Sequence, residues 1–380
     1  MNRKISLLLL FALLANFFPS FAQSTSAEVP EAEVEENESD ETANIETLLD
    51  LLGSYKPEEA ATTDGQRVEI DIYKLLAENG DTYAQLYLGA CYYLGRNVPK
   101  KDYTEAAKYF KLAAEQNDPL AQLLMGYLYY EGKGVAKNRT EAAKYYKLAA
   151  DAGNADAQNA LGECYENGKG VTKNYKEAFR YYKLAADQGH IGGQFHSGVF
   201  YYKGVGTERD YDKAAKYLKA VAEHGKKEAQ YNLGICYYNG HGVPQSYEQA
   251  AKYFKLAADQ GVGEAQYNIA LCYQEGRGVA KNPKEAFRYY KLAAAKKIPE
   301  AIFNLADCYY NGIGVAKNNK EAFKYFKQAA GQGDSEAQYI VGLLYYFGEG
   351  TTKSVSEAKK WLKKAAAQGN KDAKDFLKKL

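Results

Sequence analysis

The sequence predicts an all-α fold, an α-solenoid of eight tandem helix–loop–helix units with a capping half-repeat at each end. Three observations support this prediction. The chain has 380 residues, more than the ~250–300 at which a single hydrophobic core stops growing. Its composition is narrow, with 36 Tyr and 34 Gly against 2 Met and 1 Trp, as expected when one short segment recurs. From Asp81 to Gly369 a segment of 36 or 37 residues does recur.

Residues 1–22 have the organisation of a secretory signal peptide. Arg3 and Lys4 precede a nearly continuous apolar run, and Ser20 and Ala22 supply the small residues that a signal peptidase reads. At 14 residues, the apolar run is shorter than the ~20 residues that span a bilayer as a helix. We therefore expect an exported protein, periplasmic or extracellular, with no integral membrane span after cleavage.

Residues 23–64 are predicted to form a disordered acidic linker. Ten acids and no base lie from Glu28 to Asp50, and such a segment cannot bury enough apolar surface to offset the entropy of ordering. Within it, 44–55 has Ile and Leu at helical spacing, which predicts a short amphipathic helix. The chain from Lys56 onward holds 47 bases and 38 acids, a net charge of +9. We therefore expect intramolecular docking of the acidic tail.

Eight repeats follow the linker and a capping half-repeat. Each has a first helix, helix A, and a second helix, helix B, which need neighbouring copies to bury their apolar faces. Residues 65–80 match a helix B and 370–380 match a helix A, so both are predicted to be capping half-repeats. The eight repeats span 81–117, 118–153, 154–189, 190–225, 226–261, 262–297, 298–333 and 334–369.

Helix A is predicted to be amphipathic and closely packed. In the second repeat Ala121, Met125 and Tyr129 fall on one helical face. Gly126 lies in mid-helix, where glycine costs ~1 kcal/mol relative to alanine. Its recurrence predicts that another helix packs against this position. The glycine stands at 89, 126, 162, 198, 234 and 342, with alanine at 270 and 306.

A glycine loop and a helix start signal follow helix A. Gly132-Lys133-Gly134 is expected to end the helix, because glycine tolerates the left-handed C-cap conformation. Asn138 followed by Glu141 is typical of an N-cap with a capping-box partner. The same pair of positions has this pattern in every repeat except the fourth, where Lys213 replaces the acid.

The third repeat shows the residues that recur in most units, namely Ala157, Leu161-Gly162, Tyr165, Gly168-Lys169-Gly170-Val171, Ala178, Tyr181 and Ala185-Ala186. This unit resembles the Sel-one-like repeat (SLR), a relative of the tetratricopeptide repeat, over 81–369 and both half-repeats. The resemblance implies a superhelix with helix A on its concave side. It also implies a role in holding other proteins, as in adaptors of membrane-bound or signalling assemblies and in exported bacterial factors.

A cysteine-rich branch of that family carries a disulfide between the two helices of a repeat. The corresponding positions here hold Gln122 and Ala150, or Gln158 and Ala186, so those disulfides are absent. Some members of the branch are described as penicillin-binding or β-lactamase-like. The resemblance therefore implies β-lactamase-like or cell-wall hydrolase activity as the alternative function.

The residues themselves give little support to an enzyme. Ser356 and Lys359 fit the S-x-x-K pattern of serine β-lactamases, but they fall in the first turn of a helix B and no S-D-N or K-T-G partner exists. The four His show no H-E-x-x-H or i, i+4 pair. We predict no catalytic residue, no cofactor and no metal.

The five cysteines share one register of helix A. Equivalent helices of adjacent repeats lie ~8–10 Å apart, beyond the ~7 Å Cα separation that a disulfide allows. They are predicted to be small core residues, with a free thiol as the alternative. They are Cys91, Cys164, Cys236, Cys272 and Cys308.

The remaining face of helix A is the candidate binding site. Two registers seven residues apart are mostly aromatic, and aromatic residues with a polar tip are enriched at protein interfaces. The alternative is that they complete packing between helices. The third repeat interrupts the stripe with Asp156, Asn159, Glu163 and Glu166, which could receive a Lys or Arg. The candidate aromatic residues are Tyr93, Tyr130, Phe195, Tyr202, Tyr231, Tyr238, Tyr267, Phe303, Tyr310, Tyr339 and Tyr346.

The sequence thus predicts a non-enzymatic, exported scaffold that binds a polypeptide or envelope component along an aromatic concave groove. The Lys residues of helix B alternate with Glu and Tyr, which favours a solvated mixed face over a nucleic-acid stripe. The expected partner is a protein or peptide and no nucleic acid.

Overall fold

The computed structural model describes residues 47, 49–50 and 63–380. The chain divides into two units, 1–55 and 56–380, and the second contains all the repeats. The predicted signal peptide 1–22 lies outside the described residues, as does most of the 23–64 linker. Of the predicted helix 44–55, only Thr47, Leu49 and Asp50 are described, and all three are helical.

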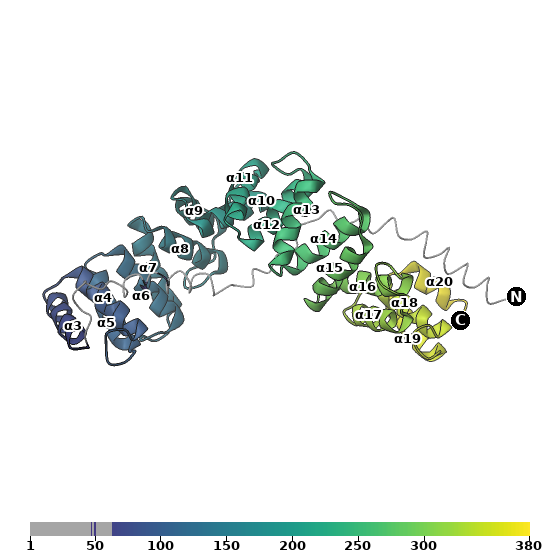
Figure 1. The fold of residues 1–380 in the computed structure, drawn as a ribbon, viewed down its shortest axis with the longest axis horizontal. Helices are drawn as coiled ribbons and strands as arrows, with labels where there is room; N and C mark the ends of the chain where they lie inside the picture. Colours follow the sequence, from purple (N-terminus) through teal and green to yellow (C-terminus); the bar gives the residue numbers. More distant parts are fainter. Residues whose placement is uncertain (1–46, 48, 51–62) are drawn as a thin grey trace. The chain divides into compact units, whose positions relative to one another are not determined.

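Within 63–380 every regular element is an α-helix, as predicted. α3 (Thr63–Glu78) caps the N-terminal end and α20 (Lys371–Leu377) the C-terminal end (Figure 1). The helices A are α4 (Thr82–Leu94), α6 (Pro119–Glu131), α8 (Ala155–Asn167), α10 (Ile191–Lys203), α12 (Lys227–Asn239), α14 (Gly263–Glu275), α16 (Pro299–Asn311) and α18 (Ser335–Phe347). The helices B are α5 (Tyr103–Glu115), α7 (Arg139–Asp151), α9 (Tyr175–Asp187), α11 (Tyr211–Glu223), α13 (Tyr247–Asp259), α15 (Pro283–Ala295), α17 (Asn319–Gly331) and α19 (Val355–Ala367).

The mid-helix glycine of helix A packs against helix B of the same repeat. A Cβ placed on Gly234 would lie 2.6 Å from a ring carbon of Phe254, and one on Gly126 would lie 2.5 Å from the ring of Tyr146. The close approach that the recurring glycine predicts is therefore confirmed. The aromatic side chain of helix B fills the space that the missing side chain leaves.

The loop after helix A uses two glycines for different reasons. Gly132 has φ +76° and is the left-handed C-cap of α6, as predicted. Gly134 has φ +71°, and a Cβ there would collide with the backbone carbonyl of Tyr103, the first residue of helix B in the preceding repeat. The second glycine thus permits backbone-to-backbone contact between repeats.

At the start of helix B the predicted N-cap is present, whereas the predicted capping box is not. Asn138 accepts hydrogen bonds from the backbone N–H groups of Thr140 and Glu141, both at 3.1 Å. However, the Asn138 N–H donates to the carbonyl of Tyr129 at 2.9 Å, and the Glu141 carboxylate pairs with Lys144 at 2.6 Å. The predicted reciprocal bond from Glu141 is therefore wrong, because the loop brings the N-cap N–H to a carbonyl in the last turn of helix A.

Buried glutamines join successive repeats. Gln158, at the position of a cysteine in the cysteine-rich relatives, donates to the carbonyl of Ala150 in the preceding helix B at 3.2 Å. Its own Oε1 accepts from Gln188 at 2.8 Å. The same pair forms between Gln260 and Gln230 at 2.7 Å. An amide relay thus holds the repeats together at this position.

In the second repeat this relay lacks one hydrogen bond, and that position gives a stability prediction. Gln122 Oε1 is buried without a hydrogen-bond partner, and the residue equivalent to Gln188 in its repeat is the exposed Ala152. Ala152→Gln should supply the missing donor and raise the free energy of unfolding by ~1 kcal/mol, as measured by chemical denaturation. Ala152→Glu, which cannot donate, is the matched control; equal stabilisation by both variants would contradict the relay.

Candidate functional site

The helix A face is the surface formed by the two predicted aromatic registers and the residues between them. Most of its first register is buried: Phe195 and Tyr231 are each 7% exposed and Tyr339 is 9% exposed. Tyr267 and Phe303 are partly exposed. The first register therefore contributes both to packing and to the accessible surface of the middle repeats.

The second register lies in sockets that join two repeats. The ring of Tyr238 lies 5.1 Å from that of Tyr247, at the start of helix B in the same repeat. Its hydroxyl accepts a hydrogen bond from Arg277 in the glycine loop of the next repeat. Tyr202 likewise contacts Tyr211 at 5.2 Å between ring centroids and His241 at 3.0 Å from its hydroxyl.

A cation just before helix B completes many of these sockets. Lys317 Nζ lies 5.0 Å from the ring centroid of Tyr310, whose hydroxyl donates to Glu349 of the next repeat at 2.9 Å. We call this arrangement the tyrosine socket: a tyrosine ring, the first residue of helix B, a cation before it, and the loop residue of the next repeat. The rings in this register belong to Tyr93, Tyr130, Tyr202, Tyr238, Tyr310 and Tyr346.

Glu163 and Glu166, predicted to share a face, do lie together on α8. Tyr182 donates to Glu166 at 2.6 Å, and burial raises the pKa of this carboxyl. Asn159 donates to Glu163 at 2.7 Å. His196 of the next repeat lies 3.8 Å from each of the two carboxylates. The patch therefore spans two repeats.

Sequence reasoning did not include histidine in this patch. The ring of His196 stacks on Tyr182 at 4.3 Å, and burial lowers its pKa to about 3, so the ring is neutral near pH 7. His190 caps α10 and lies 3.2 Å from Asp156. The place of His196 in the repeat is the one sequence signal that could have included it in the patch. His196 stands at the position that is asparagine in three later repeats, at Asn232, Asn268 and Asn304.

In the fifth to seventh repeats the helix A face carries a recurring polar set. Burial raises the pKa of both Tyr231 and Tyr267, and the side chains of Asn268 and Asn304 partly offset this effect at the two hydroxyls. Burial raises the pKa of Tyr267 to about 12. Glu264 and Glu300 raise the pKa of Tyr231 further through their charge. Adjacent repeats thus hold their polar groups in fixed positions relative to one another.

Asp307 on α16 is a further group that sequence reasoning missed. Burial raises its pKa to about 6, and Asn311 donates to it at 2.6 Å. A carboxylate with such a pKa is poorly solvated, so a nearby cation would stabilise its charged form. Perturbed pKa values of this kind cluster at functional sites.

The four His and the S-x-x-K pair all lie within the described residues. No group of three or more His, Cys, Asp or Glu in this part of the chain is arranged to hold a metal ion. Ser356 lies exposed in the first turn of α19, and Lys359 donates to the carbonyl of Leu380 at 3.1 Å. The S-x-x-K pair is therefore part of an ordinary helix start.

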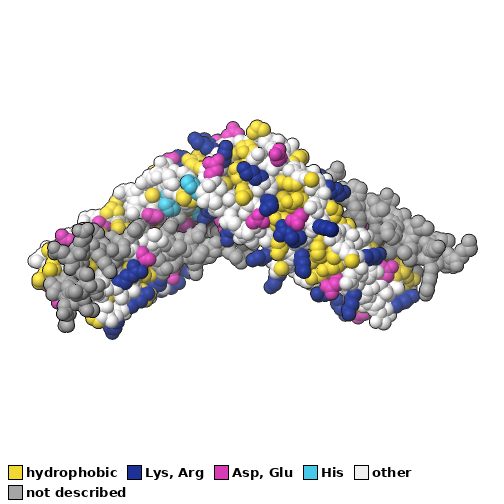
Figure 2. Space-filling view, in the orientation of Figure 1, with side chains coloured by type: hydrophobic (Ala, Val, Ile, Leu, Met, Phe, Trp, Pro, Cys, Tyr) yellow, Lys and Arg dark blue, Asp and Glu magenta, His cyan; other side chains and the backbone are white. Residues whose placement is uncertain are grey.

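On the face shown in Figure 2, charged side chains of both signs are mixed with hydrophobic ones over α12 to α15. Among the described residues, no helix combines the length and apolar character needed to cross a membrane.

The cysteines are buried, as predicted. All five side chains are at most 2% exposed, and burial raises the pKa of Cys236, Cys272 and Cys308 to about 12. Because the thiolate is the reactive form, an aromatic disulfide reagent should label none of them in native protein at pH 8 and all five in denaturant. Rapid labelling of several thiols without denaturant would contradict the orientation of helix A.

Comparison with known proteins agrees with this architecture. The Sel1 repeat family matches residues 82–118, 119–154, 155–190, 192–226, 227–262, 263–297, 299–334 and 335–370. Comparison with curated proteins gives no significant match.

Two solved structures resemble most of the chain. A protective antigen of uropathogenic Escherichia coli strains, described as displaying an SLR fold, is 30% identical with a TM-score of 0.65, covering 87% of this chain and 81% of its own. A Sel1 repeat protein from Oxalobacter formigenes is 29% identical with a TM-score of 0.61, covering 87% of this chain and 99% of its own. With eight matched repeats over most of its length, the chain belongs to the Sel1 repeat family.

Proposed function

We propose that this protein is a scaffold that binds another polypeptide along the helix A face, and that the partner places a basic side chain near Asp307. Sel1 repeat proteins are generally protein-interaction scaffolds. Solenoids of this kind present extended surfaces to which each repeat adds a similar contact. The Glu and Asn that recur in the fifth to seventh repeats, with Tyr231, Tyr267 and Phe303 between them, provide such a surface.

The placement of Asp307 on the helix A face is the observation that carries the proposal. Asp307 is partly buried, and Asn311 donates to its carboxylate at 2.6 Å. Burial raises its pKa to about 6, and Glu300, seven residues earlier on the same helix, is exposed. A Lys or Arg placed here would offset the lost solvation of Asp307, which is the usual way in which a protein compensates a poorly solvated charge. Polypeptide binding by this face therefore favours partners with exposed basic residues.

Site-specific photocrosslinking tests this proposal. Phe303→p-benzoylphenylalanine on the helix A face should capture a defined partner in the producing cell, whereas the same residue at the exposed Lys291 of α15 should not. Asp307→Asn should weaken the captured complex several-fold at pH 7.5. Because the carboxyl is charged only above its pKa of about 6, wild-type binding should also weaken as the pH falls from 7.5 to 5. Equal capture from both positions would rule out the helix A face.

We also propose that the protein acts outside the cytoplasm and that its acidic tail regulates binding. The support is in the sequence: the pattern of residues 1–22, and ten acids before a body of charge +9. The mature N-terminus should follow Ala22, as read by mass spectrometry of the exported protein. The Ile and Leu stripe of 44–55 would cover part of the helix A face, while the acids pair with the basic body. Deletion of 23–55 should therefore raise partner affinity by removing an intramolecular competitor; unchanged or lower affinity would contradict this role.

A further inference from the structure

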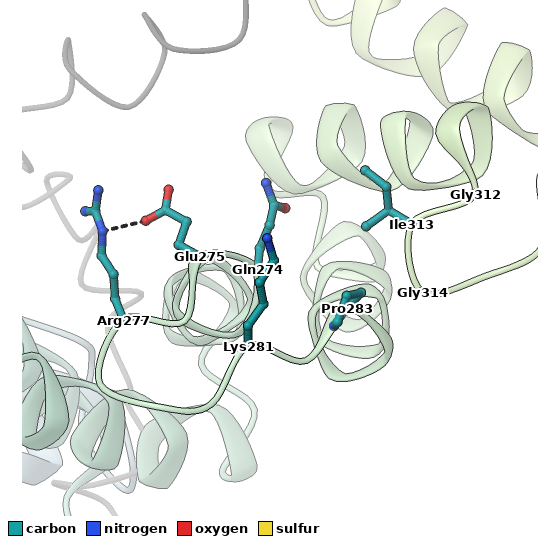
Figure 3. Close-up of a pocket in the computed structure, with 8 residues that line it drawn as sticks. All are labelled: Gln274, Glu275, Arg277, Lys281, Pro283, Gly312, Ile313 and Gly314. Carbon is teal, nitrogen blue, oxygen red and sulfur yellow. Dashed lines mark ion pairs between the residues drawn. The ribbon is translucent and has the colours of Figure 1, made fainter. Parts of the chain in front are cut away.

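A cavity of about 750 Å³ opens at the loop edge between the sixth and seventh repeats (Figure 3). Gln274 and Lys281 line one side, and Ile313 of the following repeat lies opposite. Arg277 points away from the cavity and pairs with Glu275 at 2.7 Å. The lining residues are Gln274, Glu275, Arg277, Lys281, Pro283, Gly312, Ile313 and Gly314.

This cavity occupies the place of a tyrosine socket. Gln274 stands in the second register, where six other repeats have tyrosine. The Gln274 amide is directed toward Tyr290, whose hydroxyl donates to Gln274 Oε1 at 2.7 Å, and not into the position of a tyrosine ring. Pro283 is the first residue of helix B, the position of Tyr247 in the preceding repeat, and Ile313 is the loop residue equivalent to Arg277. The remaining parts of the socket are therefore present without its ring.

The cavity retains the features that hold an aromatic ring elsewhere in the chain. Lys281 has the position of Lys317, which lies 5.0 Å from the ring centroid of Tyr310. A cation over a ring face is a favourable contact, and Pro283 and Ile313 supply apolar walls. Gly314 contacts the carbonyl of Pro283, so the backbones that form the two sides meet as in the other repeats.

We propose that this cavity is a binding socket for an aromatic side chain of the bound polypeptide, which supplies the ring that six other repeats supply themselves. The proposal rests on the proposed function and names an anchor for that same partner. The filled sockets are the argument for the occupant. In those of Tyr93, Tyr202 and Tyr238 the ring packs on the first residue of helix B, and the hydroxyl is hydrogen-bonded to the loop of the next repeat. Buried aromatic anchors of this kind commonly dominate interface energies.

The first test uses p-cresol, the side chain of tyrosine, as the probe. Titration into full-length protein should shift the Ile313 δ1-methyl NMR signal saturably. In Gln274→Tyr the built-in ring should occupy the socket and abolish the shift, while the spectrum remains that of a folded solenoid. 4-Methylcyclohexanol, of similar size without a π-system, should bind at least several-fold more weakly. An absent shift, an equal shift in Gln274→Tyr, or equal binding of the two probes would overturn the proposal.

The second test separates the socket from the scaffold function. Gln274→Tyr should lower capture of the partner crosslinked from position 303 by ~10-fold, as expected for loss of one aromatic anchor. Undiminished capture would overturn the socket while leaving the helix A face as the binding surface. Equal capture from positions 303 and 291 in the otherwise wild-type protein would overturn the scaffold proposal. The p-cresol titration would then still test the socket by itself.

Discussion

Gly242→Ala is expected to lower the free energy of unfolding by about 3 kcal/mol. Gly242 has φ +69°, and a Cβ there would collide with the backbone carbonyl of Tyr211 in the preceding repeat. The left-handed conformation costs an alanine about 1–2 kcal/mol, and forced overlap in a packed region costs a further ~1–3 kcal/mol. Because the obstacle is backbone, no change of rotamer can relieve it.

Gly225→Ala is the matched control for this prediction. Gly225 has φ +88° but nothing within 4 Å of its added Cβ, so it should show only the conformational cost of about 1–2 kcal/mol. Chemical denaturation gives the global effect, and amide hydrogen exchange should place the damage at the fourth and fifth repeats. Equal destabilisation by the two variants would mean that the inter-repeat backbone contact is absent.

The second loop glycine also shows what sequence reasoning could and could not reach in the fold. Gly132 was predicted as a C-cap because a C-cap is a local requirement of one helix. The role of Gly134 depends on the carbonyl of Tyr103, 31 residues earlier, and no local rule refers to that contact. The capping-box prediction for Glu141 failed for the same reason, since a carbonyl of another helix took its place.

The candidate site was likewise predictable only in part from the sequence. Helical spacing was enough to place Glu163 and Glu166 on one face, where the structure has them. It did not reveal that a second-register tyrosine contacts a loop residue 39 positions later, as Tyr238 contacts Arg277. A signal was nevertheless present in the sequence. The two repeats that lack the tyrosine, at Glu166 and Gln274, are followed 39 positions later by the apolar residues Val205 and Ile313. When the tyrosine is replaced, the loop residue 39 positions later is apolar, and this paired substitution could have identified the two residues as neighbours.

Tyr238→Ala is expected to destabilise the protein by about 2 kcal/mol. Full burial of an aromatic ring is worth 3–5 kcal/mol on truncation, and Tyr238 is partly exposed. Its ring packs 5.1 Å from Tyr247 and 6.3 Å from Phe254. Removing it would also separate the fifth repeat from Arg277 of the sixth. The loss should appear in chemical denaturation and as faster amide exchange on both sides of that junction.

Tyr238→Phe separates the ring from its hydroxyl. It retains the ring contacts and removes only the acceptor for Arg277, so it should cost ~0.5–1.5 kcal/mol. If Tyr238 served only a partner, both variants would keep wild-type stability and lose partner capture instead. A larger stability loss in Tyr238→Ala than in Tyr238→Phe, with partner capture by Tyr238→Phe unchanged, is the result expected of a ring that joins repeats. The empty socket at Gln274 would then be the place where a partner makes the contact that this chain makes for itself at Tyr238.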